Sequence, residues 1–421
     1  MKKTSAFYVA IRYLWSRAHE GVRYLRGAAA GIAISLVPII VTLIVADGMI
    51  RGILDRYIEL GTGHLQVVDL TRSVDNDEVI RLINGIDGVR GVWPEQRGMG
   101  VIAGRSGKTG VTVRAIEPSF WEDQGSASLL ITIEGEKTPG TNRYIVLGEM
   151  LAHNIGVKTG DTVRLMTVVP QDNGRMSTRT ASFTVRGILS CGYNELDALW
   201  CIISYEGGRR VFSYDQLSTN FIVKIDDPYR RADAFSWELY RYLESGYSVL
   251  SWVDLLDSQH KSYKMTRQLL LFIMALIVII AAVNVSSATS MLVLERQRDI
   301  AVLKVSGASV NGVTRVFLWG SFLTGLTGSV IGIAAGLLIG VNINFLVRTL
   351  EKLLSFVSNI YNGSEVKILD PGFYLETIPV VIDWKAVLMI SVFAILCSVI
   401  ASLIPAVKAG KLKPMDLLRK T

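Results

Sequence analysis

The sequence predicts a membrane α-helical protein with four transmembrane helices and a large extracytoplasmic α+β domain between the first and second helices. Composition is the first observation behind this class. The 421 residues are 50% hydrophobic and only 19% charged, with a mean hydropathy of +0.37, which is too apolar for a soluble chain of this length. The second observation is that the apolar residues gather in four long uncharged runs. Lipid is therefore expected to cover part of the surface.

Each of the four runs has at least the ~20 residues that a helix needs to cross a hydrocarbon core of about 30 Å. None contains Asp, Glu, Lys, Arg or His, which argues against an ion-coupled carrier or a polar channel, because such sites need ionisable groups within the membrane. The first run also exceeds the ~7 to 15 apolar residues of a signal peptide and lacks a clear cleavage site, which favours an uncleaved anchor. The runs are 27–46, 269–294, 316–347 and 386–407.

The short flanks of these runs differ in their content of Lys and Arg. Basic residues are concentrated before the first run, between the second and third runs, and after the fourth. The segment between the third and fourth runs is instead rich in acidic residues. Because basic flanks stay in the cytoplasm, both termini are predicted to be cytoplasmic, and segments 47–267 and 348–385 to lie outside.

These observations divide the chain into nine predicted parts. The leader has apolar residues at helical spacing with basic residues between them, which is typical of an interfacial helix, although a cytoplasmic extension of the first span fits equally well. The parts are a cytoplasmic interfacial helix (1–26), the first span (27–49), a periplasmic α+β domain (50–265), the second span (266–294), a cytoplasmic connecting helix (295–315), the third span (316–347), a periplasmic loop (348–385), the fourth span (386–407) and a cytoplasmic tail (408–421).

The extracytoplasmic segment shows a repeated strand, helix, strand order. This order occurs before Gly91 and again over 221–250, and the Gly-rich, strand-like stretch 118–218 between them is predicted to be an inserted β subdomain. Ser251 and Asp254 have the spacing of a capping box. One helix is predicted from this box through the second span, and the alternative is a break around 262–266.

The third span carries small residues four positions apart, so that they lie near one helix face. In lipid such a face lets another backbone approach closely and gain packing contacts. A neighbouring helix of the same or a partner chain is the expected contact, and a substrate groove is the alternative. The residues are Gly320, Thr324, Gly328, Gly332, Gly336 and Gly340.

The residues with reactive or metal-binding side chains form no recognisable site. The four histidines have no metal spacing, and neither a nucleophile elbow nor a zinc-protease helix is present. The stretch Ser106 to Thr109 resembles the end of a phosphate loop but lacks its upstream Gly. Cys191 and Cys201 share the outer domain, which leaves a disulfide open. No catalysis, cofactor, metal or nucleic-acid partner is expected.

The cytoplasmic connection reads ERQRDIAVLKVSGAS and predicts a short amphipathic helix, ended by a glycine, with a charged opening. It resembles the coupling helix of permeases in the family that contains the macrolide-efflux pump, the cell-division permease and the lipoprotein-releasing permeases. The tail PAVKAGKLKPMDLLR resembles the closing motif of that family. The residues that this resemblance assigns to ATPase coupling are Glu295, Arg296, Arg298, Asp299, Ile300, Leu303, Lys304 and Gly307.

Three further segments resemble the lipoprotein-releasing branch, of LolC and LolE type. They are FYVAIRYLWSR at 7–17, GEMLAHNIGVKTGD at 148–161 and FYLETIP at 373–379. The resemblance implies an inner-membrane permease of a diderm bacterium, paired with a second permease and with two cytoplasmic ATPase subunits that hydrolyse ATP. It also implies that lipoprotein cargo enters from the outer leaflet of the lipid bilayer and passes to a periplasmic carrier.

By the same resemblance, the upper parts of the first two spans would line the cargo entry, although simple packing between them is an equal alternative. The hairpin 170–178 is short and polar where some relatives have a long hook that grips the carrier, so carrier binding, and the choice between homodimer and heterodimer, stay open. An efflux or secretion permease and a cell-division type of signalling permease are the alternative functions. The entry residues would be Met49, Ile53, Tyr263 and Leu270.

Overall fold

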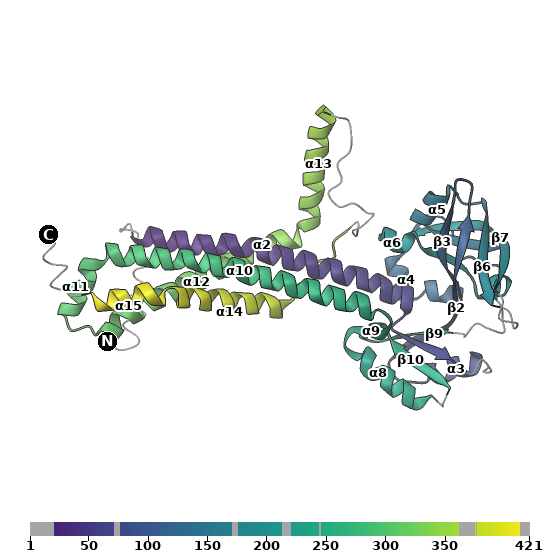
Figure 1. Cartoon of the computed structure of the whole chain (residues 1–421), viewed down its shortest axis with the longest axis horizontal. Coiled ribbons are helices and arrows are strands. Elements are labelled where there is room, and N and C mark those ends of the chain that lie inside the picture. Colours follow the sequence, from purple (N-terminus) through teal and green to yellow (C-terminus); the bar gives the residue numbers. More distant parts are fainter. Residues whose placement is uncertain are drawn as a thin grey trace. The chain divides into compact units, whose positions relative to one another are not determined.

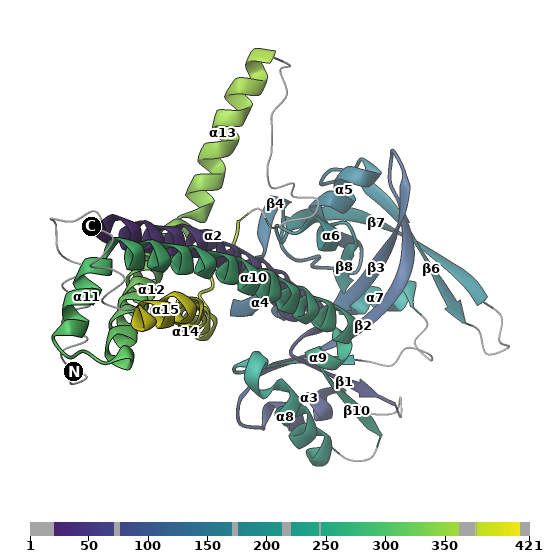
Figure 2. The ribbon, with the colours of Figure 1, turned by 60° about the vertical axis from the view of Figure 1, so that its left-hand side comes forward.

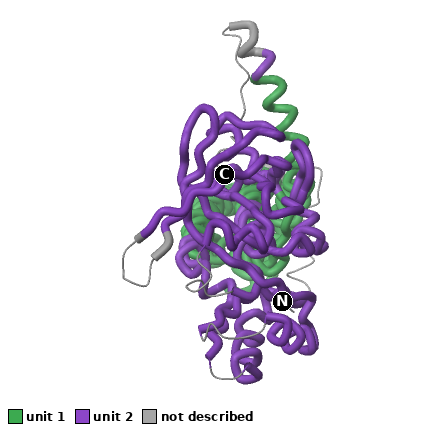
Figure 3. Tube along the Cα trace, turned by 90° about the vertical axis from the view of Figure 1, so that its right-hand side faces the viewer, with its two compact units in different colours: residues 1–48, 264–354, 379–421 green, residues 49–263, 355–378 purple. Residues whose placement is uncertain are grey.

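The computed structural model describes residues 21–70, 76–170, 176–212, 220–243, 246–361, 375 and 377–412. Contacts divide the chain into two compact units (Figure 3). Unit 1 comprises residues 1–48, 264–354 and 379–421, and unit 2 comprises residues 49–263 and 355–378. Residues 1–20 of the interfacial helix predicted for 1–26 lie outside the described residues. Most of the 170–178 hairpin and the tail beyond residue 412 lie outside them as well.

Unit 1 is helical. Four helical stretches are long and apolar enough to cross a bilayer: Leu25–Thr62, Asp257–Glu295, Val310–Val341 and Trp384–Lys411. The four predicted spans are therefore confirmed. The helices, labelled in Figure 1, are α2 (Gly21–Arg56), α10 (Asp257–Glu295), α11 (Gln297–Val305), α12 (Val310–Val341), α13 (Ile343–Tyr361), α14 (Trp384–Ala401) and α15 (Leu403–Lys411).

The glycine face of α12 lies against α2. A Cβ atom built on Gly328 would stand 2.7 Å from the backbone oxygen of Ala29, and one on Gly336 would stand 2.7 Å from the Cβ of Ile40. Real Cβ atoms do not approach so closely, so glycine is what allows the two backbones this separation. Gly332 and Gly340 face the next turns of α2 in the same way, whereas no atom lies within 4 Å of a Cβ built on Gly320.

Two helix boundaries differ from the simplest expectation. The capping box at Ser251 and Asp254 is present, but it opens only the short helix α9 (Trp252–Leu255). Leu256, with φ −111° and ψ 25°, separates α9 from α10, so the break lies ahead of the 262–266 region. The third span ends at Val341. The 348–385 region, expected to be a loop, begins within the first half of the 19-residue helix α13.

Unit 2 contains one ten-stranded sheet with the order β10-β1-β9-β2-β3-β8-β5-β7-β4, and β6 pairs with both β2 and β7. The two predicted strand, helix, strand repeats supply one end of this sheet, where β1 pairs antiparallel with β9 and β10. The first repeat is β1 (Leu65–Asp69), α3 (Asn76–Asn84) and β2 (Val89–Ala103), and the second is β9 (Asn220–Ile225), α8 (Pro228–Tyr242) and β10 (Tyr247–Ser251).

The insertion between the repeats continues the same sheet, because the 15-residue strand β2 pairs with β9 along its first half and with β3 and β6 further on. The segment that resembled a phosphate loop is the turn between β2 and β3, in which Gly104 donates to the oxygen of Gly107. Figure 2 shows the insertion from a second side. Its elements are β3 (Lys108–Ile116), η2 (Pro118–Trp121), α4 (Gln124–Leu129), β4 (Ile131–Gly135), β5 (Tyr144–Gly148), α5 (Glu149–Ile155), β6 (Thr162–Pro170), β7 (Met176–Ser190), α6 (Asn194–Asp197), β8 (Trp200–Ser204) and α7 (Tyr205–Val211).

The two cysteines of unit 2 are not bonded to each other. Both thiols are free and buried, so the disulfide that the sequence left open is not formed. Cys201 belongs to the hydrophobic cluster around Phe183, and Cys191 belongs to a separate cluster around Trp121. Burial raises the pKa of both thiols well above its usual range, which keeps them protonated and unreactive.

Candidate functional site

The helix predicted for ATPase coupling is α11, and one side of it is anchored to unit 1. Ile300 is buried in a cluster with residues of α2, α10, α12 and α15, and its neighbour Ala301 is buried as well. Arg296 forms an ion pair with Asp299 at 2.9 Å, which closes the first turn. Lys304 donates from Nζ to the backbone oxygen of Leu412. Gly307, with φ +90°, ends the turn after the helix.

The opposite side of α11 is exposed. Glu295 and Arg298 are exposed, as the assignment to a contact with a partner requires, and Leu303 is half-buried. Sequence reasoning missed Val302 and Val305, which are 63% and 72% exposed. Arg298, Val302 and Val305 follow an i, i+4, i+7 spacing and therefore share one face, a signal that was readable in the sequence. The exposed face combines one guanidinium with two apolar side chains.

The outer ends of three helices in unit 1 meet at an ion cluster that sequence reasoning also missed. Arg267 of α10 donates to Asp47 Oδ2 of α2 at 3.1 Å and to Asp383. Asp383 is the N-cap of α14, because its Oδ1 accepts from the backbone nitrogens of Lys385 at 3.0 Å and Ala386 at 3.2 Å. The signal for this cluster was a charged residue beside each of three apolar runs. The cluster ties α2, α10 and α14 together.

In unit 2, the helix that continues α2 ends in a π-helical turn, η1 (Tyr57–Thr62), whose Glu59 contacts Lys224 and His64. Lys224 of β9 lies 3.0 Å from Glu59 Oε2, and its Nζ also donates to Asp123 at 2.7 Å and to Ser126 at 2.6 Å. His64 Nε2 lies 2.9 Å from Glu59 Oε1. The Lys224 side chain is completely buried. We call these five residues the charged joint.

A second ion group caps the same turn. Arg114 donates to the backbone oxygen of Leu60 and to Glu95, and Arg97 donates to the backbone oxygen of Gly61 and lies 2.9 Å from Glu95. Burial lowers the pKa of Arg114 to about 10, although the Glu95 carboxylate favours the charged form. The guanidinium is therefore still charged at neutral pH. These contacts supply donors to the carbonyls at the end of the turn.

The residues suggested for cargo entry fall into two clusters. Ile53 is buried in the cluster around Trp121 in unit 2, and Met49 and Tyr263 are partly buried against it. Leu270 packs against the helical core of unit 1.

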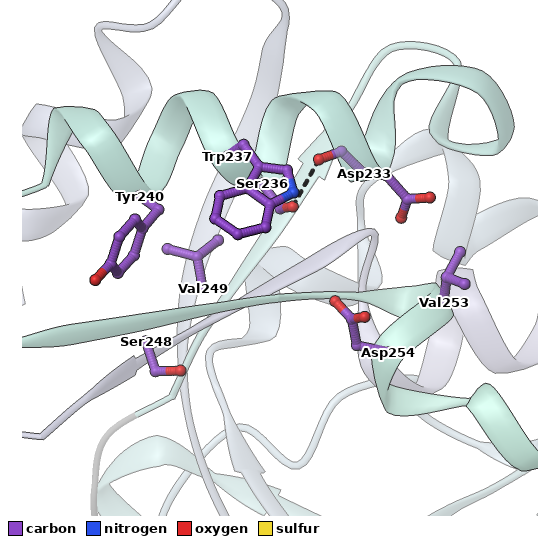
Figure 4. Close-up of a pocket in the computed structure, with 8 residues that line it drawn as sticks. All are labelled: Asp233, Ser236, Trp237, Tyr240, Ser248, Val249, Val253 and Asp254. Carbon is purple, nitrogen blue, oxygen red and sulfur yellow. Dashed lines mark hydrogen bonds between the residues drawn. The ribbon is translucent and has the colours of Figure 1, made fainter.

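A groove of about 540 Å³ lies between α8 and the strand β10 (Figure 4). Trp237 and Tyr240 stand on its α8 side and are 68% and 54% exposed. Its carboxylates are occupied, because Asp233 and Asp254 both accept hydrogen bonds from Ser251. Within the described ranges, no group of three or more His, Cys, Asp or Glu side chains could hold a metal ion. The groove thus offers exposed aromatic surface beside hydrogen-bonded carboxylates.

Comparisons with known proteins match both units. The family model of the MacB-like periplasmic core domain matches residues 27–235, and that of the FtsX-like permease C-terminal matches residues 271–414. The lipoprotein-releasing system transmembrane protein LolC of Xylella fastidiosa (strain 9a5c) is 27% identical over 418 residues, covering 98% of each chain. LolE of Haemophilus influenzae is 23% identical over 425 residues, again covering 98% of each chain.

Among solved structures, the periplasmic region of MacB from Actinobacillus actinomycetemcomitans is 13% identical, with a TM-score of 0.31, and covers 48% of this chain and 94% of that chain. The extracellular domain of the transporter YknZ is 12% identical, with a TM-score of 0.29, and covers 44% of this chain and 99% of that chain. The chain belongs to the ABC transporter permeases that join a MacB-like periplasmic core domain to an FtsX-like permease C-terminal part, and it is similar along 98% of its length to LolC and LolE.

Proposed function

We propose that this chain is a permease subunit of an ATP-driven transporter that extracts lipoproteins from the outer leaflet of the inner membrane and releases them toward the outer membrane. The observation that carries this proposal is the end-to-end similarity to LolC and LolE, which covers both units without a large gap. The proposal places both termini in the cytoplasm and unit 2 in the periplasm. ATP hydrolysis belongs to a separate partner chain.

Depletion of the permease tests the cargo assignment. If the chain releases lipoproteins, its loss strands outer-membrane lipoproteins in the inner membrane, as membrane fractionation would show. Normal lipoprotein sorting after depletion, together with drug sensitivity or a division defect, would refute the assignment and favour one of the other permease functions. Co-purification from native membranes identifies the ATPase, any second permease, a periplasmic carrier and lipid-modified cargo.

Within this proposal, α11 is the contact with the ATPase. The exposed face of Arg298, Val302 and Val305 supports this role, because a guanidinium beside two apolar side chains suits a partner pocket with an acidic rim. The buried side of α11 supports it as well, since Ile300 is packed against the rest of unit 1 and a push on the helix would move its neighbours. Glu295, the last residue of α10, is also exposed and precedes the exposed face of α11 in the sequence.

Replacing Glu295 and Arg298 with Ala is expected to lower ATPase stimulation by the permease several-fold while insertion in the membrane is retained. Val302→Ser with Val305→Ser is expected to do the same. Lys261→Ala, which removes a 73% exposed charge at the far end of α10, is the matched control and is expected to leave turnover unchanged. Unchanged turnover in both α11 variants would exclude this helix as the contact.

The proposed cargo entry is formed by Met49, Ile53, Tyr263 and Leu270. Met49 and Tyr263 are only partly buried, which supports contact with a lipid chain, whereas Ile53 is buried. A photo-crosslinking side chain at Tyr263 or Leu270 is expected to capture acylated cargo in the presence of ATP. The same group at Leu396, which is 54% exposed on α14, is the control, and equal capture there would refute an entry at these positions.

A further inference from the structure

The helix that follows the third span, α13, has one apolar side and one polar side. Plotted at 100° per residue, the polar residues other than Thr349 occupy a third of the circumference, and the remainder is apolar apart from Thr349. The polar side is formed by Asn344, Arg348, Glu351, Lys352 and Ser355, and the apolar side is formed by Ile343, Leu346, Val347, Leu350, Leu353 and Leu354.

The apolar side of α13 is uncovered within the part of the chain that the structure describes. Leu346, Leu350 and Leu353 are 42%, 50% and 57% exposed. Phe345 and Phe356, at the border of the apolar side, are 71% and 69% exposed. Removing such large apolar side chains from water is favourable, so an apolar environment stabilises this side of the helix.

The position of α13 along the chain indicates which environment this is. The preceding helix α12 has 32 residues and is therefore about 48 Å long, which exceeds the ~30 Å hydrocarbon core and matches the full thickness of a bilayer with its headgroups. Its end at Val341 thus lies at the level of the headgroups. Asn342, with φ −96° and ψ 17°, breaks the helix there, and the first part of α13 leaves the bundle sideways (Figure 1).

Apolar exposure also continues from one helix to the next. Leu338 and Val341 in the last turn of α12 are 69% and 51% exposed, as expected of side chains that face lipid, and the exposed Phe345 and Leu346 follow directly. The breadth of the apolar side distinguishes lipid from a partner helix, because a paired helix shows a narrower seam of apolar residues at 3.5-residue spacing. Arg348 and Lys352 on the polar side suit lipid phosphates.

We propose that α13 lies in the plane of the bilayer surface at the end of the third span, with its leucine side among the acyl chains of the outer leaflet and its basic side toward the lipid phosphates. In this position α13 anchors the third span and fixes its depth in the bilayer. The proposal rests on the four-span fold and does not depend on the nature of the cargo.

The test uses the full-length permease in lipid nanodiscs, with Cys397→Ser removing the half-buried native thiol. Single nitroxide labels are placed at Leu350 and Leu353 on the apolar side and at Arg348 and Lys352 on the polar side. Collision rates with molecular oxygen and with a water-soluble nickel chelate then give the depth of each label. The apolar-side labels are expected to lie ~5 to 10 Å below the phosphates, with several-fold higher oxygen-to-nickel ratios than the polar-side labels.

Two control sites bracket the measurement, Leu269 on the exposed surface of the second span and Lys261 outside it. Equal nickel access on both sides of α13 would show that the helix is in water and would overturn the proposal. Low access to both reagents at Leu350, with short distances between labels on two copies, would show a protein interface and would also overturn it. As a second variant, Leu353→Gln is expected to move a label at Leu346 toward water, whereas Lys352→Gln is not.

Discussion

The Lys224 ammonium is the centre of the charged joint, and its removal gives the sharpest test of how unit 2 holds the end of the first long helix. The side chain is completely buried, and both Glu59 and Asp123 lie within 3.0 Å of its nitrogen. Methionine has a similar length and no charge. Lys224→Met therefore leaves two carboxylates, only 17% and 15% exposed, without their shared cation.

Breaking a buried ion pair by removing one partner costs about 3 to 5 kcal/mol, because the remaining charge is desolvated without compensation. For a domain of 150–250 residues, 1 kcal/mol changes Tm by roughly 2 to 4 °C, so the expected loss is ~6 to 20 °C. Thermal unfolding of the full-length permease in nanodiscs, followed by intrinsic tryptophan fluorescence, measures this change. The loss is expected to shrink as the pH falls, because an unpaired buried carboxylate has a raised pKa and accepts a proton.

Lys261→Met is the matched control. Its ion pair with Asp257 is 2.8 Å long but 73% and 52% exposed, so its loss is expected to cost no more than about 0.5 kcal/mol. Adding Asp123→Asn to Lys224→Met removes one of the two stranded charges, keeps an N-cap for α4, and is expected to restore part of the stability. If Lys224→Met and Lys261→Met lowered Tm equally, the joint would not be a structural contact of the kind argued here.

Other predictions follow from the same reasoning. Gly336→Leu is expected to separate α2 from α12 and to lower the recovery of folded permease in gel filtration. Gly320→Ala is expected to be neutral, because a Cβ there meets no atom within 4 Å. Equal recovery of the two variants would argue against glycine-mediated packing. Arg267→Met is expected to cost about 1 to 3 kcal/mol in thermal unfolding by stranding two aspartates, and a Tm unchanged within error would contradict this. Cys191 and Cys201 are expected to resist a thiol reagent at pH 8 until the protein unfolds, as peptide mass analysis would show, because burial raises both pKa values. Stability is expected to fall progressively as the pH rises above the ordinary thiol pKa of ~8.5 toward the raised pKa of the folded state, because only the unfolded thiols ionise in that window. Rapid labelling of the native protein would contradict their burial.

The spans were predictable because each rests on an uninterrupted local property. A run of apolar residues of sufficient length specifies a helix in lipid whatever its neighbours are. The repeated strand, helix, strand order was also readable, since short alternating runs and helical runs differ in period. The strand pairing could not be read from the sequence. The insertion joins the same sheet through β2, which pairs with β9 through its first residues and with β6 through its last.

The helix α13 illustrates how a sequence can carry a clear pattern that is read too coarsely. An uncharged run extends from Val316 to Val347, and its length suggested one span to its end. The structure ends that span at Val341 and starts a new amphipathic period at Ile343. The length of an uncharged run shows where a helix can cross lipid. The change from apolar residues on all sides of the helix to apolar residues on one side shows where the helix leaves the hydrocarbon core.

The two cysteines show what the sequence leaves undetermined. It places both residues in one domain, but it does not give the distance between them. Cys191 and Cys201 are ten positions apart, with α6 between the end of one strand and the start of another. Their side chains belong to different hydrophobic clusters. Which side of a sheet a residue faces depends on register, and register depends on partner strands that are remote in sequence.

The buried charges around η1 have a physical cause that only the fold reveals. The last carbonyls of any helix lack partners within the helix, and at an exposed end water supplies them. Here the end is enclosed, since Ile58, Leu60 and Thr62 are all buried. Arg114 and Arg97 therefore supply the missing donors, and Glu95 then compensates their charge. A helix that ends inside a domain thus explains why strands far along the sequence carry arginines where apolar side chains are otherwise expected.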